Sequence, residues 1–223
     1  MHSIKAGVLM QIYYSKSSLR GQHQLSAKES YQDGFSLIEV SIVTAIIMLI
    51  AIIGIPAIQA YVIENKVPRV AEEIQRFVAR IKANTHGFGS TPYAGIHNGT
   101  LASALRGSSV VSVSGEGAMS NIAHGLGGLG TSGRGVVQIE AHSLAGAGRG
   151  SAFSITFTDV NEAACPALAS ILQRIAESVT ISGRAGAAQV KNATQSPPQP
   201  YNPILADAQC SSGDSNTFQF VVR

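Results

Sequence analysis

The sequence is poor in the residues from which catalytic pockets and nucleic-acid-binding faces are built. It contains no tryptophan, and aromatic residues make up 6 % and charged residues 13 % of its 223 residues. Lysine and arginine form no run interleaved with aromatic residues, so nucleic-acid binding has little support. The formal charge of +3 is a small surplus, because the chain after residue 34 holds 12 of the 16 basic and 11 of the 13 acidic residues.

Catalytic and metal-ligating arrangements are missing as well. No serine stands in G-x-S-x-G, and no Ser–Lys or His–Asp arrangement stands out. The run "GLGGLG" at 125–130 (Gly125, Gly127 and Gly130) matches G-x-G-x-x-G, but it lacks the flanking strand and helix that dinucleotide binding needs, so we interpret it as a flexible inter-strand loop. We therefore expect no enzyme activity, cofactor, metal site or small-molecule substrate. Four histidines of the C-terminal part show no zinc-like spacing: His86, His97, His124 and His142.

Cysteine is nearly absent, since the chain contains only Cys165 and Cys210. Both lie far downstream of a long hydrophobic segment. If that part is exported to an oxidising space, one disulfide is expected. It would close a loop of about 45 residues and stabilise the fold by roughly 4 kcal/mol in the chain-entropy model. The alternative is a cytosolic protein with two reduced, buried thiols.

Long hydrophobic runs are confined to a single stretch, Phe35–Ile58. Its part from Val40 to Ile58 carries no charge, and a bilayer span needs about 20 apolar residues. The run is longer than the apolar region of an ordinary secretory signal, and no Ala-x-Ala-like cleavage site follows it. Further on, apolar residues recur at intervals of 4, 3, 4, 3 and 4, which predicts one stripe on a continuing helix. This stripe consists of Ile63, Val67, Val70, Ile74, Phe77 and Ile81.

These patterns predict one helix from Phe35 to about Asn84, apolar all round in its first half and amphipathic in its second. We expect the stripe to pack on a globular domain. Pro68, and Pro56 with Gly54 beside it, are expected to bend or open the helix, because each proline removes a backbone donor.

One carboxylate, Glu39, stands near the start of the apolar run. It falls within the first turns, where the helix dipole favours negative charge. A carboxylate inside a span is costly unless it is paired or lies near the interface. Two interpretations stay open: an interfacial residue with no further role, or a group that pairs with a cation arriving from outside the helix.

The heptapeptide "GFSLIEV", residues 34–40, gives these features a common context. Gly34 followed by Phe35, with Glu39 four residues on at the head of a long apolar helix, resembles the class III signal of type IV pilins and their relatives. The resemblance implies that a membrane peptidase cuts between Gly34 and Phe35 and methylates the new amine of Phe35. It also implies that Glu39 is the assembly glutamate, which pairs with the N-terminal amine of a neighbouring subunit, and that Pro56 marks a helix kink.

The leader that this cut would remove, residues 1–34, is long, as is typical of type IVb pilins. Met10 is an alternative start and would give a 25-residue leader.

Residues 85–223 change character and are predicted to form a head of short strands and loops. A helix after Pro166, "ALASILQRIAES" (167–178), lies between the two cysteines, and "NTFQFVVR" (216–223) is predicted to be the final strand. This order resembles the head of type IVb pilins. The expected fold is α+β, the type IV pilin fold: a long N-terminal α-helix packed on an antiparallel β-sheet head with a disulfide-bounded C-terminal segment. The other expected strands are "SSVVSVSG" (108–115), "GVVQIEA" (135–141) and "SAFSITFTDV" (151–160).

The expected function is that of a structural subunit of a type IVb-like pilus. As a precursor it would be a single-pass protein of the inner membrane, and after polymerisation it would be part of an extracellular filament serving adhesion, aggregation, motility or conjugative contact. Its expected partners are other copies of itself, prepilin peptidase and the pilus assembly machinery. The alternatives are a pseudopilin or minor pilin of a type II secretion or related system, and an exported enzyme or binding protein on an uncleaved anchor. The expected parts are the leader 1–34, the membrane and filament-core half 35–58, the amphipathic half 59–84 and the head 85–223.

Overall fold

The computed structural model describes residues 34, 36–85 and 89–223; residues 1–33, Phe35 and residues 86–88 lie outside the described residues. The chain divides into one unit that ends at Ala45 and a compact unit, Ile46–Arg223. The first helix, α1, covers Leu37–Thr85, close to the bounds predicted from its apolar pattern.

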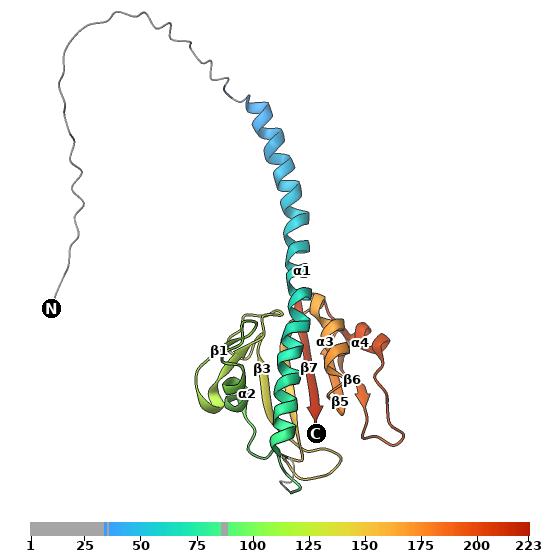
Figure 1. Ribbon diagram of the computed structural model, residues 1–223. Coiled ribbons are helices and arrows are strands. Elements are labelled where there is room, and N and C mark those ends of the chain that lie inside the picture. The colour runs from blue at the N-terminus through green and yellow to red at the C-terminus, as the bar shows by residue number, and fades with distance from the viewer. Residues whose placement is uncertain (1–33, 35, 86–88) are drawn as a thin grey trace, which may run out of the picture. The chain divides into compact units, whose positions relative to one another are not determined.

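The second half of α1 packs against the sheet by the predicted stripe. Val67, Val70 and Ile74 are fully buried and Phe77 nearly so, whereas Ile63 and Ile81 at the stripe's ends are partly buried. Figure 1 shows this part of α1 lying across the sheet. The helix is held here by packing rather than by helix propensity, because the stripe places one apolar face against the strands.

The main sheet has five strands in the order β3-β4-β7-β5-β6, and all pairs are antiparallel. The last strand of the chain is therefore the central one, between β4 and β5. A separate two-stranded sheet pairs β1 with β2. The strands are β1 Ser112–Ser114, β2 Asn121–Ala123, β3 Val137–His142, β4 Ala152–Asn161, β5 Ser178–Gly183, β6 Gly186–Asn192 and β7 Asp214–Val222.

Short helices flank the sheet, and α2 and α4 begin with side-chain caps. His97 accepts a hydrogen bond from the backbone N–H of Gly99 at the start of α2, and Asn202 accepts one from Leu205 at the start of α4. Pro166 and Pro203 stand in the first turns of α3 and α4, where the missing N–H costs nothing. The helices are α2 Asn98–Leu105, η1 Gly117–Met119, η2 Glu162–Ala164, α3 Cys165–Leu172 and α4 Pro203–Gln209.

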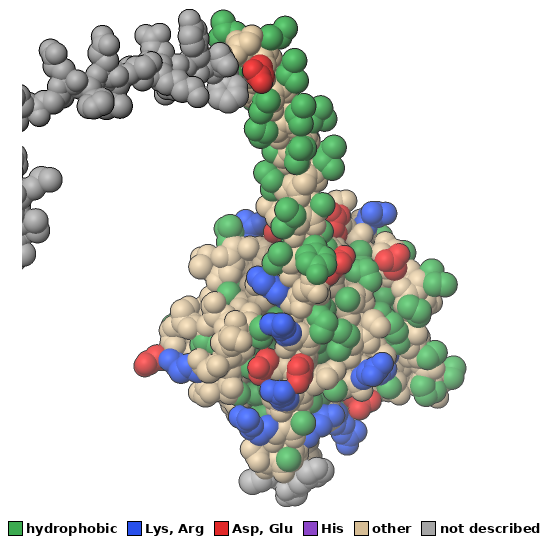
Figure 2. All heavy atoms as spheres, turned by 45° about the horizontal axis from the view of Figure 1, so that its top comes forward, with side chains coloured by type: hydrophobic (Ala, Val, Ile, Leu, Met, Phe, Trp, Pro, Cys, Tyr) green, Lys and Arg blue, Asp and Glu red, His purple; other side chains and the backbone are tan. Residues whose placement is uncertain are grey.

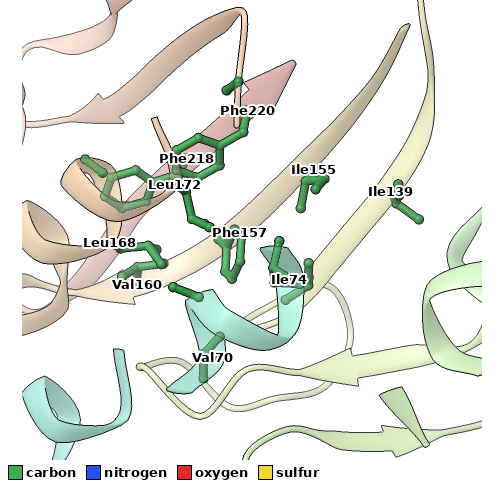
Figure 3. Packing of buried hydrophobic residues seen from close by; sticks show 14 of the residues in the cluster. Val70, Ile74, Ile139, Ile155, Phe157, Val160, Leu168, Leu172, Phe218 and Phe220 are labelled. Carbon is green, nitrogen blue, oxygen red and sulfur yellow. The ribbon is translucent and has the colours of Figure 1, made fainter. Parts of the chain in front are cut away.

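The core of the head is built from phenylalanines of adjacent strands. Phe157 stands opposite Phe218 in the β4–β7 register, and the rings of Phe157 and Phe220 meet edge to face with centroids 6.1 Å apart. Figure 3 shows side chains from α1, α3 and the sheet converging on this one interior. Among the residues labelled there are Val70 and Ile74 of α1, Leu168 and Leu172 of α3, and Ile155, Phe157, Phe218 and Phe220 of the sheet.

The predicted α+β fold is confirmed, and strands form within each stretch where one was expected. The helix predicted over 167–178 is too long, because α3 ends at Leu172. Ser178 instead begins β5 and pairs with both Val221 of β7 and Asn192 of β6. Five α-helices and strands lie where none was predicted, namely α2, β2, β5, β6 and α4, and so do the short 3-10 helices η1 and η2.

Candidate functional site

The first half of α1 is covered with apolar side chains that nothing in the described chain buries. The helix is long and apolar enough to cross a membrane, and its most apolar window has no buried residue. Figure 2 shows hydrophobic side chains along the visible face of this part of the helix. The most exposed of them in the stretch from Leu37 to Ile58 are Leu37, Ile38, Ile50, Ile52, Ile53 and Ile58.

Only three side chains between Leu37 and Ile58 carry a polar oxygen or nitrogen: Glu39, Ser41 and Thr44. The hydroxyl of Ser41 donates to the carbonyl of Ile38 at 2.8 Å, and that of Thr44 donates to the carbonyl of Val40 at 2.7 Å. These two hydroxyls are therefore satisfied by their own helix, as a bilayer requires.

Glu39 differs from both neighbours. Its carboxylate makes no hydrogen bond or ion pair with any residue that the structure describes. It is exposed and lies in the first turn, where the uncompensated backbone N–H groups favour an anion. The helix dipole offsets part of the cost of an anion in apolar surroundings, and the remainder calls for a cation from elsewhere.

Gly34 and Ser36 lie outside the helix, and the N–H of Val40 donates a hydrogen bond to the carbonyl of Ser36 at 3.1 Å. A Cβ on Gly34 would meet no atom within 4 Å, so packing does not require glycine there. Phe35, the predicted methylation site, and leader residues 1–33 lie outside the described residues. Helix α1 continues through Pro56, where the predicted kink stays a prediction.

The two cysteines are joined, with a Cα–Cα distance of 6.0 Å across 45 residues of sequence. Cys165 starts α3 and Cys210 follows α4, so the bridge encloses α3, the β5–β6 hairpin and α4. Asn216 of β7 links the end of this disulfide-closed segment to the sheet. Its side chain accepts a hydrogen bond from the N–H of Ser211 and donates to the carbonyls of Ser211 and Val160. The expected disulfide is thus present.

A buried histidine holds the turn after β2. The ring of His124 is fully buried; Nδ1 accepts from the N–H of Leu126 at 3.0 Å, and Nε2 donates to the carbonyl of Thr158 at 2.9 Å. Burial lowers the pKa of His124, while its bond to Thr158 and the charges of Asp159 and Asp214 oppose that shift. His124 therefore has a structural role, which the spacing of the histidines in the sequence did not indicate.

The glycine run at 125–130 joins β2 to the strand pair that follows it, as predicted, and no helix follows it to complete a dinucleotide motif. The interpretation as a flexible loop is wrong in one respect, because the segment is closely packed. A Cβ on Gly127 would stand 2.6 Å from the backbone N of Asn161, and the N–H of Gly128 donates to Asp214 at 2.9 Å. These glycines allow one backbone to approach another.

Metal ligands do not gather in the described part of the chain, where no group of three His, Cys, Asp or Glu residues forms. His97 caps α2, His124 is the buried histidine described above, His142 ends β3, and His86 lies outside the described residues.

Comparison with known protein families gives a match over most of the chain. The model of the PilS family, described as "PilS N terminal", matches residues 68–223. Among solved structures, a type IV b pilin from Salmonella typhi aligns with 18 % identity and a TM-score of 0.45, over 68 % of this chain and 94 % of that one. TcpA, a type IV pilin from the Vibrio cholerae El Tor biotype, aligns with 14 % identity and a TM-score of 0.44, over 72 % of this chain and 99 % of that one. No curated protein sequence matches the chain.

Proposed function

The chain belongs to the PilS family of type IV pilins, and we propose that it is the structural subunit of a type IVb-like pilus. In this proposal the precursor is anchored in the inner membrane, cut between Gly34 and Phe35 by prepilin peptidase, and N-methylated on Phe35. The assembly machinery then polymerises it through α1 into a surface filament for adhesion, aggregation, motility or conjugative contact. Its role is structural rather than catalytic.

One observation carries the proposal: Glu39 is the polar side chain of the apolar half that no described residue satisfies, whereas Ser41 and Thr44 bond to their own helix. A charged group inside a span is costly, up to about 3 kcal/mol at the centre and less toward the ends, where Glu39 lies. A cut after Gly34 would create an amine at the head of each neighbouring chain. Pairing that amine with Glu39 neutralises two charges that are each unfavourable in an apolar filament core.

The apolar half supports the same conclusion. Its exposed side chains need an apolar environment, since burying one large aliphatic side chain is worth about 1.5–3 kcal/mol. The bilayer supplies that environment to the precursor, and the helices of neighbouring subunits supply it in a filament. We therefore assign 1–34 to the leader, 35–58 to the membrane and filament core, 59–84 to the head-packing half of the helix, and 85–223 to the head.

The disulfide-closed segment favours a pilin over a pseudopilin. Major pseudopilins resemble pilins in their N-terminal signal but have smaller heads without such a segment. Here the bridge between Cys165 and Cys210 encloses two helices and a hairpin.

The decisive experiment compares Glu39→Ala with Ser41→Ala in cells that otherwise make filaments. We expect Glu39→Ala to leave cleaved protein in the membrane and to abolish surface filaments, because the amine of the next subunit has no partner. Ser41→Ala is the matched control: it removes a polar group two residues away whose hydroxyl bonds only within the helix, and it should leave filaments at wild-type abundance. Electron microscopy and immunoblots of sheared and membrane fractions provide the readout. Normal filaments on the Glu39→Ala strain would refute the pairing.

Processing is tested by the intact mass of protein sheared from the cell surface. The proposal expects a chain that begins with N-methylated Phe35 and is two hydrogens lighter than the reduced form. A chain that retains residues 1–34 would overturn it, and a cleaved chain found only in membranes would favour the pseudopilin.

A further inference from the structure

A cleft opens beside α1 just beyond its apolar half, with a volume of about 640 Å³. It lies wholly within the compact unit Ile46–Arg223. One wall is α1 itself and the other is the head around β1. The polar lining residues are Tyr61, Asn65, Lys66 and Arg69 on α1, and Ser109 and Ser112 on the head.

The cleft carries two positive charges, and no acidic residue lines it. Among the described residues, neither Lys66 nor Arg69 forms an ion pair, whereas Arg76 on the same helix pairs with Glu72. The ammonium of Lys66 lies 3.8 Å from where a Cβ on Gly125 would stand, so this side chain reaches across the cleft to the head wall. Figure 2 shows Lys and Arg side chains on the face of the head beside α1, where the hydrophobic surface of the helix gives way to a mixed one. The site is therefore suited to an anion.

The cleft lies along α1 at the outer edge of the headgroup region of a bilayer, within reach of long cationic side chains. Taking Ile58 as the end of the uncharged run, Tyr61 follows about 4–5 Å further along the axis, Lys66 about 12 Å and Arg69 about 16 Å. Headgroups add roughly 5–8 Å beyond each side of the hydrocarbon core. Helical side chains tilt toward the N-terminus, which here is toward the apolar half, so long cationic side chains can reach that level. Tyr61, which is 67 % exposed, has the place typical of an interfacial aromatic residue.

We propose that this cleft binds the phosphate-bearing headgroup of an anionic phospholipid while the chain is anchored in the membrane. Lys66 and Arg69 pair with the phosphate, the hydroxyls of Ser109 and Ser112 donate hydrogen bonds to its oxygens, and Tyr61 lies at the glycerol level. The inference rests on the proposed membrane-anchored precursor. Its consequence is a subunit whose head is fastened to the membrane by a lipid that it must release on entering the filament.

The test uses the full chain in nanodiscs of phosphatidylcholine mixed with phosphatidylglycerol, followed by native mass spectrometry of the lipids that the released protein retains. Wild type should retain phosphatidylglycerol in preference to phosphatidylcholine. The double variant Lys66→Gln, Arg69→Gln should lose that preference by about 30-fold, since each cation near an anionic surface contributes roughly fivefold. Equal retention by wild type and this variant would overturn the proposal.

Two further variants separate the cleft from general charge. Arg80→Gln with Lys82→Gln removes the same charge from the same helix about 33 Å beyond Ile58, several Debye lengths away, and should retain the lipid as wild type does. Ser112→Glu keeps both cations but places a carboxylate on the opposite wall, and it should lose the preference. Undiminished retention by Ser112→Glu would show that the cations act outside the cleft and would overturn the proposal.

Two controls identify the source of the phosphate and the step that fails. Millimolar glycerol 3-phosphate should not displace the retained lipid; displacement would show a site for free phosphate and would overturn the lipid assignment. Flotation with pure phosphatidylcholine vesicles tests the membrane anchor alone. A chain that fails to float contradicts the proposed precursor, whereas one that floats but shows no lipid preference contradicts only this inference.

Discussion

The two halves of α1 form one continuous helix, but they differ in what surrounds their side chains. In the second half, one face is buried against the sheet and the other is polar. In the first half, apolar side chains cover every face and none is buried by the described chain. The polar groups follow the same division: both ring nitrogens of His124 find partners inside the head, while the carboxylate of Glu39 finds none among the described residues.

This contrast separates folding from assembly. The head contains what it needs to fold: one core, a bridged C-terminal segment and the amphipathic half of the helix. The apolar half contributes nothing to that core and depends on surroundings outside the chain. Changes in one half should therefore leave the property governed by the other half intact.

Removing the disulfide should give the largest effect on the head. Cys165→Ser with Cys210→Ser is expected to lower the free energy of unfolding by about 4 kcal/mol, because the bridge closes a long loop in the unfolded chain. Urea unfolding followed by circular dichroism measures the loss. Flotation with vesicles should be unchanged, since the apolar half is untouched. A variant that loses both stability and membrane association would show that folding of the head and membrane association are not independent.

Truncating one isoleucine in each half is the most direct comparison. Ile74→Ala removes a fully buried side chain and should cost the head about 3 kcal/mol. Ile47→Ala makes the same chemical change where the side chain is 59 % exposed, and it should leave head unfolding within about 0.5 kcal/mol of wild type. Both are read from the same urea curves. Comparable destabilisation by the two variants would show that the halves fold as one cooperative unit.

The helix and its division could be predicted from the sequence because both rest on strong local patterns. Apolar residues at alternating intervals of 4 and 3 from Ile63 to Ile81 predict a helix with one buried face. The uncharged run from Val40 to Ile58 predicts a half that is apolar on every face. Strands β1, β3, β4 and β7 fall within runs of β-branched and aromatic residues, so they could be placed as well. The assembly role of Glu39 came from the resemblance and stays a proposal.

The missed elements depend on contacts that are distant in sequence. Strand β6, "GAAQVKN", has little strand propensity of its own and forms because a two-residue turn after Gly183 folds it onto β5. The run "SVTIS" of β5 contains β-branched residues that favour a strand, but the helix predicted just before it was extended into this run. His124 and Gly127 matter through partners more than 30 residues away, which no local motif announces.

The pH dependence of head stability should depend in part on His124. Folding lowers its pKa below the ordinary value of 6.5, so the unfolded chain takes up the proton first as the pH falls. This contribution is complete above about pH 7 and is lost as the pH falls through 6.5 toward the folded pKa. His124→Gln keeps a donor for Thr158 but cannot titrate in this range. We expect it to lower stability at pH 7 and to flatten the slope between pH 5 and 7 in urea unfolding; an unchanged slope would contradict the assignment.

The exposed face of the second half should matter least. Glu72 and Arg76 form an ion pair four residues apart on that face, with both side chains more than half exposed. Water and salt screen such a pair, so Glu72→Ala or Arg76→Ala should change head stability by about 0.3–0.5 kcal/mol, less at high ionic strength. A double-mutant cycle measured by urea unfolding isolates the coupling. A coupling above about 1 kcal/mol would contradict the interpretation of this pair as an exposed, screened contact within one helix.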